Sequence, residues 1–367
     1  MIRVLQVIHS MHLGGAENFI MNVYRTIDRS QIQFDFLVNC SGEFDDEIER
    51  LGGKVWMIPY VNQVGPFRYR MELNRFFSQH QEYQVVHSHL DMVSGEVIAC
   101  AKKSGVKCCF THSHSTGTTG NFVVKALKRF YQKKIARYVD VRLACSEQAG
   151  KWLYGDADFQ VVNNAIELDK FSCDEACRKE LRKKYGFSEH TCVIGHVGRF
   201  SKVKNHTFLI ELFEKYMESH NDTVLLLCGD GEEKPAIQKM VDDRRLTEKV
   251  IFFPAATDVF KMYHMMDVFV FPSLFEGMSL AMVEAQTNGL PVVASDTIDP
   301  KSALTENVRF VSLQAGLDVW VREIDTARQR ARRDEKDKIV AAGFDIHKTA
   351  AMLQQCYLDA CQKNAYD

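Results

Sequence analysis

The chain has 367 residues, of which 46% are hydrophobic and 26% are charged, and its formal net charge is -2. This length suggests two domains of ordinary globular composition. The near-neutral charge argues against a dedicated nucleic-acid-binding protein, whose surface is usually strongly basic.

Neither the cysteines nor the apolar runs indicate a secreted or membrane-spanning protein. The 11 cysteines form no C-x-x-C pair, which favours buried, reduced thiols and leaves zinc binding by cysteine without support. Arg3 interrupts the short apolar run at the N-terminus, unlike a signal peptide. No segment approaches the ~18–20 uncharged apolar residues of a membrane-spanning helix. We therefore expect a cytoplasmic protein, with peripheral contact to the inner face of the cell membrane left open.

In chain order, short β-branched runs alternate with helical patterns. The first half has apolar runs at residues 2–8, 34–39, 54–58, 85–89, 107–111, 141–145 and 160–163, and helical patterns at 16–27, 45–51 and 94–104. After a charged helical pattern at residues 175–185, runs return at 192–197, 224–228, 250–253, 268–271 and 291–294. This alternation predicts parallel sheets joined by crossover helices and covered on both faces.

We therefore predict an α/β protein with two Rossmann-like domains that join near residues 166–190, where the apolar content falls. A final helix near residues 347–363 is indicated by the helical spacing of Ala350, Leu353, Tyr357 and Cys361. The spacing alone leaves open the domain on which this helix docks.

Two glycines, Gly14 and Gly15, end the first predicted strand and open a helix. A backbone without Cβ atoms lets a ligand approach closely, and free N–H groups at a helix start favour an anion. The dinucleotide fingerprint G-x-G-x-x-G is absent, and a plain tight turn explains the pair equally well.

A basic loop follows the first strand of the second half and carries Gly198, Arg199 and Lys204. Ligands of open α/β sheets bind outside the carboxyl ends of the strands. Arginine offers a bidentate fork and lysine a point charge, which together suit a diphosphate. The alternative is a solvated basic loop.

The most specific segment is residues 271–285, where a strand ends, Gly277 permits a turn, and a helix is predicted to start at Met278. The backbone N–H groups of Met278, Ser279 and Leu280 would then be free first-turn donors that favour a phosphate. Glu276 and Glu284 would lie about 10 Å apart on a helix rising ~1.5 Å per residue. That separation exceeds the ~5–5.5 Å of retaining glycosidase pairs and suits contacts with two parts of one extended ligand.

Taken together, these motifs resemble the retaining GT-B glycosyltransferases of family 4, over nearly the whole chain. The elements that carry the resemblance are Gly14-Gly15-Ala16-Glu17, residues 161–166, Gly198-Arg199 with Lys204, Gly229-Asp230-Gly231, the E-x7-E pair Glu276/Glu284, and residues 289–295. Softer features are similar to the capsular and exopolysaccharide branch. The resemblance implies a GT-B fold, with an acceptor-side domain of residues 1–167 plus the helix 347–367, and a nucleotide-sugar-binding domain of residues 168–346.

The resemblance also implies roles for individual residues. Arg199 and Lys204 would stabilise the donor diphosphate as a leaving group, Glu276 would contact the transferred sugar, and Glu284 would hydrogen-bond the ribose hydroxyls. The other expected donor-binding positions are Gly14, Gly15, Asn164, Gly198, Gly277, Met278, Ser279 and Leu280. An oxocarbenium-like state, with the departing phosphate oxygen guiding the acceptor on the same face, would give retention without a protein nucleophile.

The family places a histidine near the donor sugar after an N-domain strand, and Thr111-His112-Ser113-His114 offers two candidates. We favour His114 as the catalytic one, because it lies one step further into the loop, and keep His112 as a donor-binding candidate. His87 and His89 end another strand and could line the acceptor side.

Several positions depart from the family pattern. Residues 296–300 lack the usual glycine-rich turn, Asn163 stands where many members have proline, and Ala165 where many have glycine. Pro254-Ala255 replaces a common glycine near the base pocket, so the identity of the donor base stays open.

Residues 121–138 carry six basic residues and no acidic one, with apolar residues on one helical face. Such a helix can lie on an anionic membrane or pack as a core helix with a solvated basic face. No D-x-D motif stands in a suitable loop, so we expect no essential metal or other cofactor.

The sequence thus predicts a retaining enzyme that transfers a hexose or N-acetylhexosamine from a nucleotide sugar, most simply UDP-linked, to a polysaccharide or lipid-linked oligosaccharide. One alternative is a nucleotide-sugar epimerase of the same fold. Another is a catalytically silent scaffold that binds nucleotide sugars.

Overall fold

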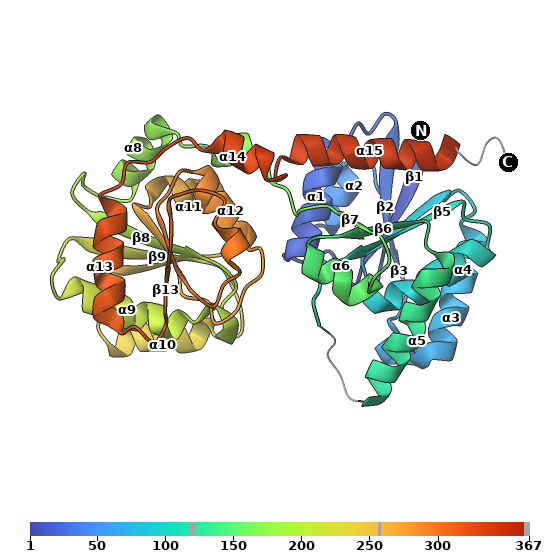
Figure 1. The fold of residues 1–367 in the computed structure, drawn as a ribbon, viewed down its shortest axis with the longest axis horizontal. Coiled ribbons are helices and arrows are strands. Elements are labelled where there is room, and N and C mark those ends of the chain that lie inside the picture. Colours follow the sequence, from blue (N-terminus) through green and yellow to red (C-terminus); the bar gives the residue numbers. More distant parts are fainter. Residues whose placement is uncertain (118–121, 256–257, 363–367) are drawn as a thin grey trace. The chain divides into compact units, whose positions relative to one another are not determined.

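The computed structural model describes residues 1–117, 122–255 and 258–362. Contacts divide the chain into two compact units, each a sheet layered with helices (Figure 1). Unit 1 comprises Met1–Ala165 and Asp345–Asp367, and unit 2 comprises Ile166–Phe344. The sequence placed these boundaries after residues 167 and 346.

Unit 1 contains a seven-stranded sheet with the order β3-β2-β1-β4-β5-β6-β7, and its strands pair in parallel. The strands are β1 (Ile2–Val7), β2 (Ile32–Val38), β3 (Val55–Met57), β4 (Val85–Ser88), β5 (Cys108–Ser113), β6 (Val141–Ala144) and β7 (Gln160–Val161). Every residue of β2, β4 and β5 is buried, as a sheet covered on both faces requires.

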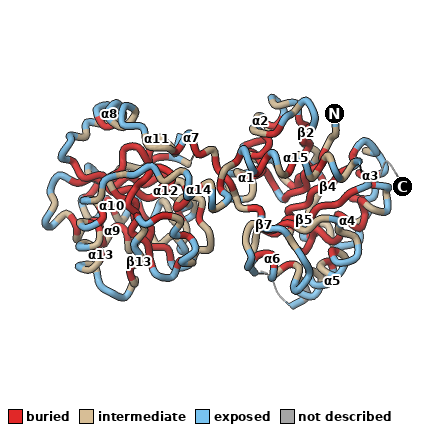
Figure 2. The backbone as a smooth tube through the Cα atoms, turned by 45° about the horizontal axis from the view of Figure 1, so that its top comes forward, coloured by how far each residue is buried: buried red, intermediate tan, exposed pale blue. Residues whose placement is uncertain are grey.

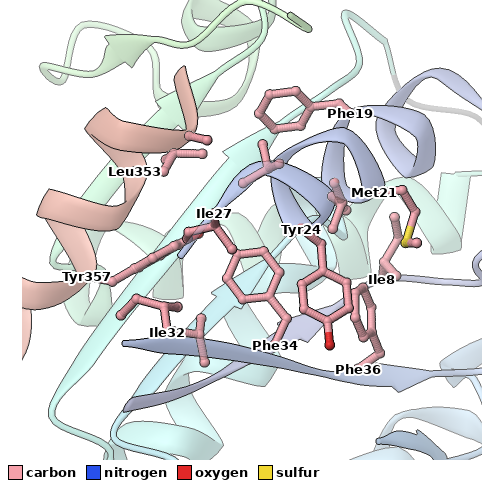
Figure 3. Packing of buried hydrophobic residues seen from close by; sticks show 14 of the residues in the cluster. Ile8, Phe19, Met21, Tyr24, Ile27, Ile32, Phe34, Phe36, Leu353 and Tyr357 are labelled. Atoms are coloured by element: carbon pink, nitrogen blue, oxygen red, sulfur yellow. The ribbon is translucent and has the colours of Figure 1, made fainter. Parts of the chain in front are cut away.

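The helices of unit 1 are α1 (Gly15–Thr26), α2 (Asp45–Arg50), α3 (Val61–Gln79), η1 (Asp91–Val93), α4 (Ser94–Lys103), α5 (Phe122–Tyr138), α6 (Glu147–Tyr154) and α15 (Ile346–Gln362). The C-terminal helix α15 packs beside α1. Figure 3 shows Leu353 and Tyr357 of α15 pointing into the core that contains Phe34, and the rings of Tyr357 and Phe34 meet edge to face at 5.9 Å. The last helix therefore completes the core of the N-terminal half.

Unit 2 contains a six-stranded sheet with the order β10-β9-β8-β11-β12-β13, again parallel. The strands are β8 (Cys192–Val197), β9 (Thr223–Cys228), β10 (Val250–Phe253), β11 (Val268–Phe271), β12 (Val292–Ser295) and β13 (Val308–Val311). The helices are α7 (Leu168–Phe171), α8 (Glu175–Lys184), η2 (Lys202–Lys204), α9 (His206–Met217), α10 (Lys234–Asp243), α11 (Val259–Met265), α12 (Leu280–Thr287), η3 (Pro300–Ser302), α13 (Leu317–Arg328) and α14 (Lys336–Ala341).

Buried residues gather along the strands of each unit, while the outer sides of the helices are exposed (Figure 2). In each sheet, the first strand of the unit lies between the second and the fourth, which is the Rossmann order. Loops that follow the first and fourth strands diverge there, and this point usually forms the ligand site of an open α/β sheet.

Helix α3 and strand β13 are among the elements that have no counterpart in the sequence prediction. Helix α3 contains Gly65 with a positive φ of 78°, followed by Pro66, so two helical segments join across a kink. Because glycine followed by proline is typical of a turn, the sequence pattern did not predict a helix here. Strand β13 is a short edge strand in which Arg309 is exposed, and its pattern is too brief to stand out.

Candidate functional site

The carboxyl ends of β8 and β11 lie side by side in unit 2, because these strands are neighbours at the point where the strand order reverses. The loop after β8 carries Gly198, Arg199 and Lys204, and the loop after β11 carries Glu276. Side chains far apart in sequence are therefore brought to one edge of the sheet.

Lys204 and Glu276 form an ion pair across this edge. The Lys204 Nζ lies 2.6 Å from Glu276 Oε1, with 15% and 19% of the side chains exposed. The ammonium also lies 4.5 Å from the centre of the Phe271 ring. Asn205, in a left-handed conformation with φ 57°, donates a hydrogen bond to the carbonyl of Pro272 at 3.1 Å. The two loops are thus tied together at the base of the pair.

Arg199 does not join this pair. Its guanidinium donates to Glu232 Oε2 at 3.1 Å, and its side chain is 73% exposed. The two expected diphosphate cations therefore hold different carboxylates, one partly buried and one in solvent. An exposed ion pair is worth little, so Arg199 can exchange Glu232 for an anionic ligand at small cost.

The loop after β9 makes a close backbone approach to the loop after β8. A Cβ atom on Gly229 would lie 2.1 Å from the carbonyl oxygen of Gly198, and one on Gly231 would lie 2.4 Å from that of Phe200. Both glycines also have positive φ angles, 150° and 154°, which side-chain-bearing residues rarely adopt. Glycine is required here for the loops to meet.

The helix after Glu276 begins later than the sequence predicted. Ser279 is the N-cap and α12 starts at Leu280, so the assignment of Met278 and Ser279 to the first helical turn was wrong. The backbone stays extended through Glu276, whose carbonyl accepts from the N–H of Asp299 at 3.0 Å. Because this short parallel bridge to the segment after β12 keeps Glu276 extended, the helix begins only at Leu280.

A row of free backbone donors results from this arrangement. Among the hydrogen bonds between described residues, none has the N–H of residues 277–281 as its donor. The carbonyl of Gly277 accepts from Ser302 Oγ at 2.9 Å, which fixes one of these peptides. Consecutive free N–H groups that end in a helix N-terminus make a favourable anion site.

Glu284 lies inside α12 and accepts a hydrogen bond from the Tyr263 hydroxyl at 2.7 Å. Burial raises the pKa of this carboxyl to about 7, against the opposing effect of the Tyr263 hydroxyl. Glu276 and Glu284 thus have separate partners and environments.

Besides the histidines, three candidate donor residues lie in unit 1. Gly14 is the N-cap of α1 and Gly15 its first residue. A Cβ on Gly15 would meet nothing within 4 Å, so the space above this peptide is open. The Oδ1 atom of Asn164 is buried and makes no hydrogen bond within the described part of the chain.

The two candidate histidines differ in exposure. His112 lies in β5 and is fully buried, while His114 follows the strand and is partly exposed. His114 Nε2 is 2.8 Å from His89 Nδ1, and its backbone N–H donates to Asp91 at 3.0 Å. Burial lowers the pKa of His114 to about 4 and that of His112 well below its usual value, so both rings are neutral near pH 7.

A cavity of about 290 Å³ lies within unit 1 and is lined in part by His89, the partner of His114. His9, Tyr60, Asp91, Lys128 and Trp152 contribute to its lining. Asp91 has a positive φ of 48°, and burial raises the pKa of its carboxyl. Aromatic rings, an acid and a cation around a small cavity suit a polar ligand such as a sugar.

Helix α5 covers residues 122–138 of the basic segment, whereas Asn121 lies outside the described residues. Its apolar face includes Tyr131 and Ile135, which are buried in the core. Lys134 turns inward to pair with the buried carboxylate of Glu96. Among the described side chains of the helix, the exposed large apolar and basic ones are Phe122, Lys125, Arg129, Phe130, Lys133 and Arg137.

Comparison with known proteins identifies the family. A family model described as "Glycosyl transferase 4-like domain" matches residues 14–159, and one described as "Glycosyl transferases group 1" matches residues 177–335. The putative glycosyltransferase EpsF of Bacillus subtilis is 31% identical over 375 residues, covering 99% of this chain and 98% of the relative. The chain is a GT-B glycosyltransferase of the family 4 type.

Two further proteins, one similar in sequence and one similar in structure, support this family assignment. The Escherichia coli protein named UDP-Gal:alpha-D-GlcNAc-diphosphoundecaprenol alpha-1,3-galactosyltransferase is 24% identical, over 95% of this chain and 94% of the relative. Anabaena Alr3699/HepE, solved with UDP and with UDP-glucose, has a TM-score of 0.77 and 18% identity, over 98% of this chain and all of that chain. The predicted GT-B fold of two parallel-sheet α/β domains is confirmed. Within the described residues, no helix has the length and apolarity needed to cross a bilayer.

Within each unit, sequence reasoning missed residues that hold the candidate side chains. Glu232 holds Arg199, and Tyr263 holds Glu284. Asp91 fixes the loop that carries His114. Glu232 stands directly after the Gly229-Asp230-Gly231 motif, which was a usable signal, whereas Tyr263 lies in an ordinary apolar helix pattern and gave none.

Proposed function

We propose that this glycosyltransferase moves a hexose or N-acetylhexosamine from a UDP-sugar, with retention, to a polysaccharide or lipid-linked oligosaccharide acceptor. The observation that carries the proposal is the Lys204–Glu276 pair at the strand-order reversal of unit 2, next to the free N–H groups of residues 277–281. This arrangement offers a cation, a hydrogen-bond acceptor and anion-binding amides at one edge of a sheet.

The donor diphosphate is assigned to Lys204, Arg199 and the amide row. Departure of the diphosphate leaves negative charge on its terminal oxygens, and preorganised donors stabilise that charge most strongly in the transition state. The expected contribution of Gly198 is to leave room for this approach. Because these groups supply the positive potential, we propose that transfer requires no metal ion at the diphosphate.

The two glutamates are assigned to opposite ends of the donor. Glu276 would accept hydrogen bonds from hydroxyls of the transferred sugar, in place of part of its contact with Lys204. Glu284, half-buried beside Tyr263, would accept from the ribose hydroxyls. Neither glutamate is proposed as a nucleophile, because Glu276 is paired with Lys204 and Glu284 is assigned to the ribose. Retention then follows from acceptor attack on the face that the diphosphate leaves.

Unit 1 would supply the acceptor side and a histidine for the donor sugar. We assign the sugar contact to His114, because His112 is fully buried in its strand. The cavity beside Asp91 and Trp152 would receive the acceptor sugar. The E. coli relative takes its name from a lipid diphosphate acceptor, and Lys128 in the cavity lining would suit such an anionic group.

Helix α5 supports contact with a membrane that holds a lipid-linked acceptor. Phe122 is 86% exposed and Phe130 53% exposed, beside exposed basic residues, and this combination favours an anionic bilayer surface. Co-sedimentation with vesicles rich in phosphatidylglycerol tests the assignment. Phe130→Ser with Lys133→Ser should abolish sedimentation and leave UDP binding unchanged.

The function is tested by incubating the purified full-length chain, with and without chelator, with a panel of UDP-hexoses and UDP-N-acetylhexosamines and with undecaprenyl-diphosphate-linked sugars. The proposal expects UDP release that depends on the acceptor and a product whose anomeric configuration by NMR matches the donor. An epimerised donor or no turnover with intact UDP binding would instead favour the epimerase or the silent scaffold.

A further inference from the structure

Four histidines converge at the carboxyl ends of β4 and β5 in unit 1, namely His87, His89, His112 and His114. The rings of His87 and His112 stack at a centroid distance of 5.5 Å, and those of His87 and His89 at 4.2 Å. Ring nitrogens of His87, His89 and His112 lie within 4.8 Å of one another. All three residues are buried.

Several nitrogens in this cluster face the interior without a partner. Among the described residues, His87 Nε2 and both ring nitrogens of His112 are buried and make no hydrogen bond. A buried nitrogen left unpaired costs free energy, and stacking of rings does not satisfy it. The free nitrogens therefore point to a missing partner that accepts several lone pairs at once.

The outer nitrogens of two of these rings are already oriented by oxygen atoms. His87 Nδ1 lies 2.7 Å from the hydroxyl oxygen of Tyr357, and His89 Nε2 lies 2.9 Å from Oε1 of Gln6. An N–H donated to each oxygen leaves the lone pair on His87 Nε2 and on His89 Nδ1. A metal-binding histidine typically donates its other N–H to such an oxygen.

We propose that His87, His89 and His112 form a binding site for one divalent transition-metal ion, with Zn²⁺ as the representative cation. Neutral imidazoles are preferred ligands of Zn²⁺, Co²⁺ and Ni²⁺, whereas Mg²⁺ and Ca²⁺ prefer oxygen. Zn–N bonds of ~2.0–2.1 Å place ligand nitrogens about 3.4 Å apart in a tetrahedron. Closing the site therefore requires the three rings to rotate so that their nitrogens, now within 4.8 Å of one another, approach this separation.

The site differs from the proposed donor site in place and purpose. It lies in unit 1, whereas the diphosphate is assigned to residues of unit 2, so the metal is not the counterion of the leaving group. It joins the ends of β4 and β5 and, through Tyr357 and Gln6, connects them to α15 and β1. Its role is to stabilise this end of unit 1.

Metal binding also affects His114. His114 Nε2 is hydrogen-bonded to His89 Nδ1 at 2.8 Å, which is the atom that the metal would take. Occupancy therefore frees His114 from His89 and leaves its ring available for the proposed sugar contact. His112, in contrast, is committed to the metal and is unavailable to a sugar.

The experiment uses the full-length chain after dialysis against a chelator, titrated with Co²⁺ and followed by its visible absorption, with Zn²⁺ added in competition. We expect one Co²⁺ per chain, intense bands typical of a four-coordinate ion, and their loss when Zn²⁺ is added. Zn²⁺ should also raise the thermal midpoint of the chain, since it binds only the folded state.

The matched variants are His87→Gln and His112→Gln, with the exposed His190→Gln as control. The first two should bind Co²⁺ at least tenfold more weakly and the control should not change. Tyr357→Phe, which keeps the ring in the core, should weaken binding by about 10–100-fold and covers the case in which a histidine variant does not fold. UDP binding by the same preparations shows whether unit 2 is intact, independently of the metal.

Absence of stoichiometric Co²⁺ or Zn²⁺ binding at micromolar concentration would overturn the proposal. Unchanged binding in both histidine variants would overturn it as well, because the metal would then sit on other groups. Neither result would bear on sugar transfer, which is measured separately.

Discussion

Lys204 Nζ and Glu276 Oε1 are 2.6 Å apart in a partly buried ion pair that joins the loops after β8 and β11. The pair holds a cation and an acceptor at the strand-order reversal before any ligand arrives. Such preorganisation lets the site stabilise developing charge without reorganising. The proposed transfer reaction depends on this relationship.

Replacement of Lys204 should therefore impair chemistry more than folding. We expect Lys204→Met to lower kcat/KM for the UDP-sugar by about 10²–10³-fold, the size seen when one donor to a developing oxyanion is removed. The control is Lys202→Met, since Lys202 is exposed in the same short helix. Steady-state kinetics with both variants gives the answer, and equal losses would show that the loop rather than the Lys204 ammonium matters.

Glu284 should make donor binding depend on pH. Its pKa of about 7 lies above the usual value because burial penalises the carboxylate, whereas ribose hydroxyls favour the carboxylate as an acceptor. Binding should therefore release a proton near pH 6–7, and affinity for UDP-glucose should rise about tenfold from pH 6 to pH 8.

Calorimetry in two buffers of different ionisation enthalpy measures this proton release. Glu284→Gln should flatten the pH dependence. The same raised pKa favours the protonated carboxyl in the folded state, so its contribution to stability is full below about pH 4.5 and is lost as the pH rises through about 7. An affinity for UDP-glucose that falls as the pH rises would contradict the assignment.

Two glycine substitutions separate folding from ligand approach. A Cβ on Gly277 meets no atom within 4 Å, so Gly277→Ala should keep the thermal midpoint and weaken UDP binding if a phosphate lies over this peptide. Gly229→Ala places a Cβ 2.1 Å from the carbonyl of Gly198 and should lower both stability and affinity. Thermal shift with and without UDP measures both, with Gly117→Ala as an open-space control in unit 1.

The C-terminal helix should be essential for the stability of unit 1. Tyr357 is buried against Phe34 and Phe110, so Tyr357→Ala should cost about 3–5 kcal/mol, as large aromatic-to-alanine changes in cores do. Tyr357→Phe loses only the hydroxyl near His87 and should cost less. Urea unfolding measures both values, and a cost under 1 kcal/mol for the alanine variant would mean that α15 is not integral to the core.

Strand and helix periodicity predicted most of the fold, because parallel sheets covered on both faces leave uninterrupted apolar runs. The prediction failed where individual residues or tertiary contacts interrupted the apolar pattern. Gly65-Pro66 hides the kinked α3, and the exposed Arg309 interrupts the short β13. The start of α12 was placed two residues too early, because the bridge from Glu276 to the segment after β12 is a tertiary contact.

The site was predictable where a motif fixes backbone position and not where side chains choose partners. The motifs located Lys204, Glu276 and Glu284 but did not indicate that Arg199 would pair with Glu232. The histidine cluster was not predicted from the sequence for a similar reason. His87 and His112 lie 25 positions apart in sequence, and only the parallel pairing of β4 with β5 brings their rings together.

The most direct test is calorimetric titration of the purified chain with UDP, GDP, ADP and CMP, repeated with Lys204→Met and Glu284→Ala. The account predicts that UDP binds most tightly, and that each substitution weakens UDP binding at least tenfold while the melting curve without ligand keeps a single cooperative transition. Tighter binding of another nucleotide would contradict the UDP assignment. Unchanged UDP binding in both variants would contradict the site itself.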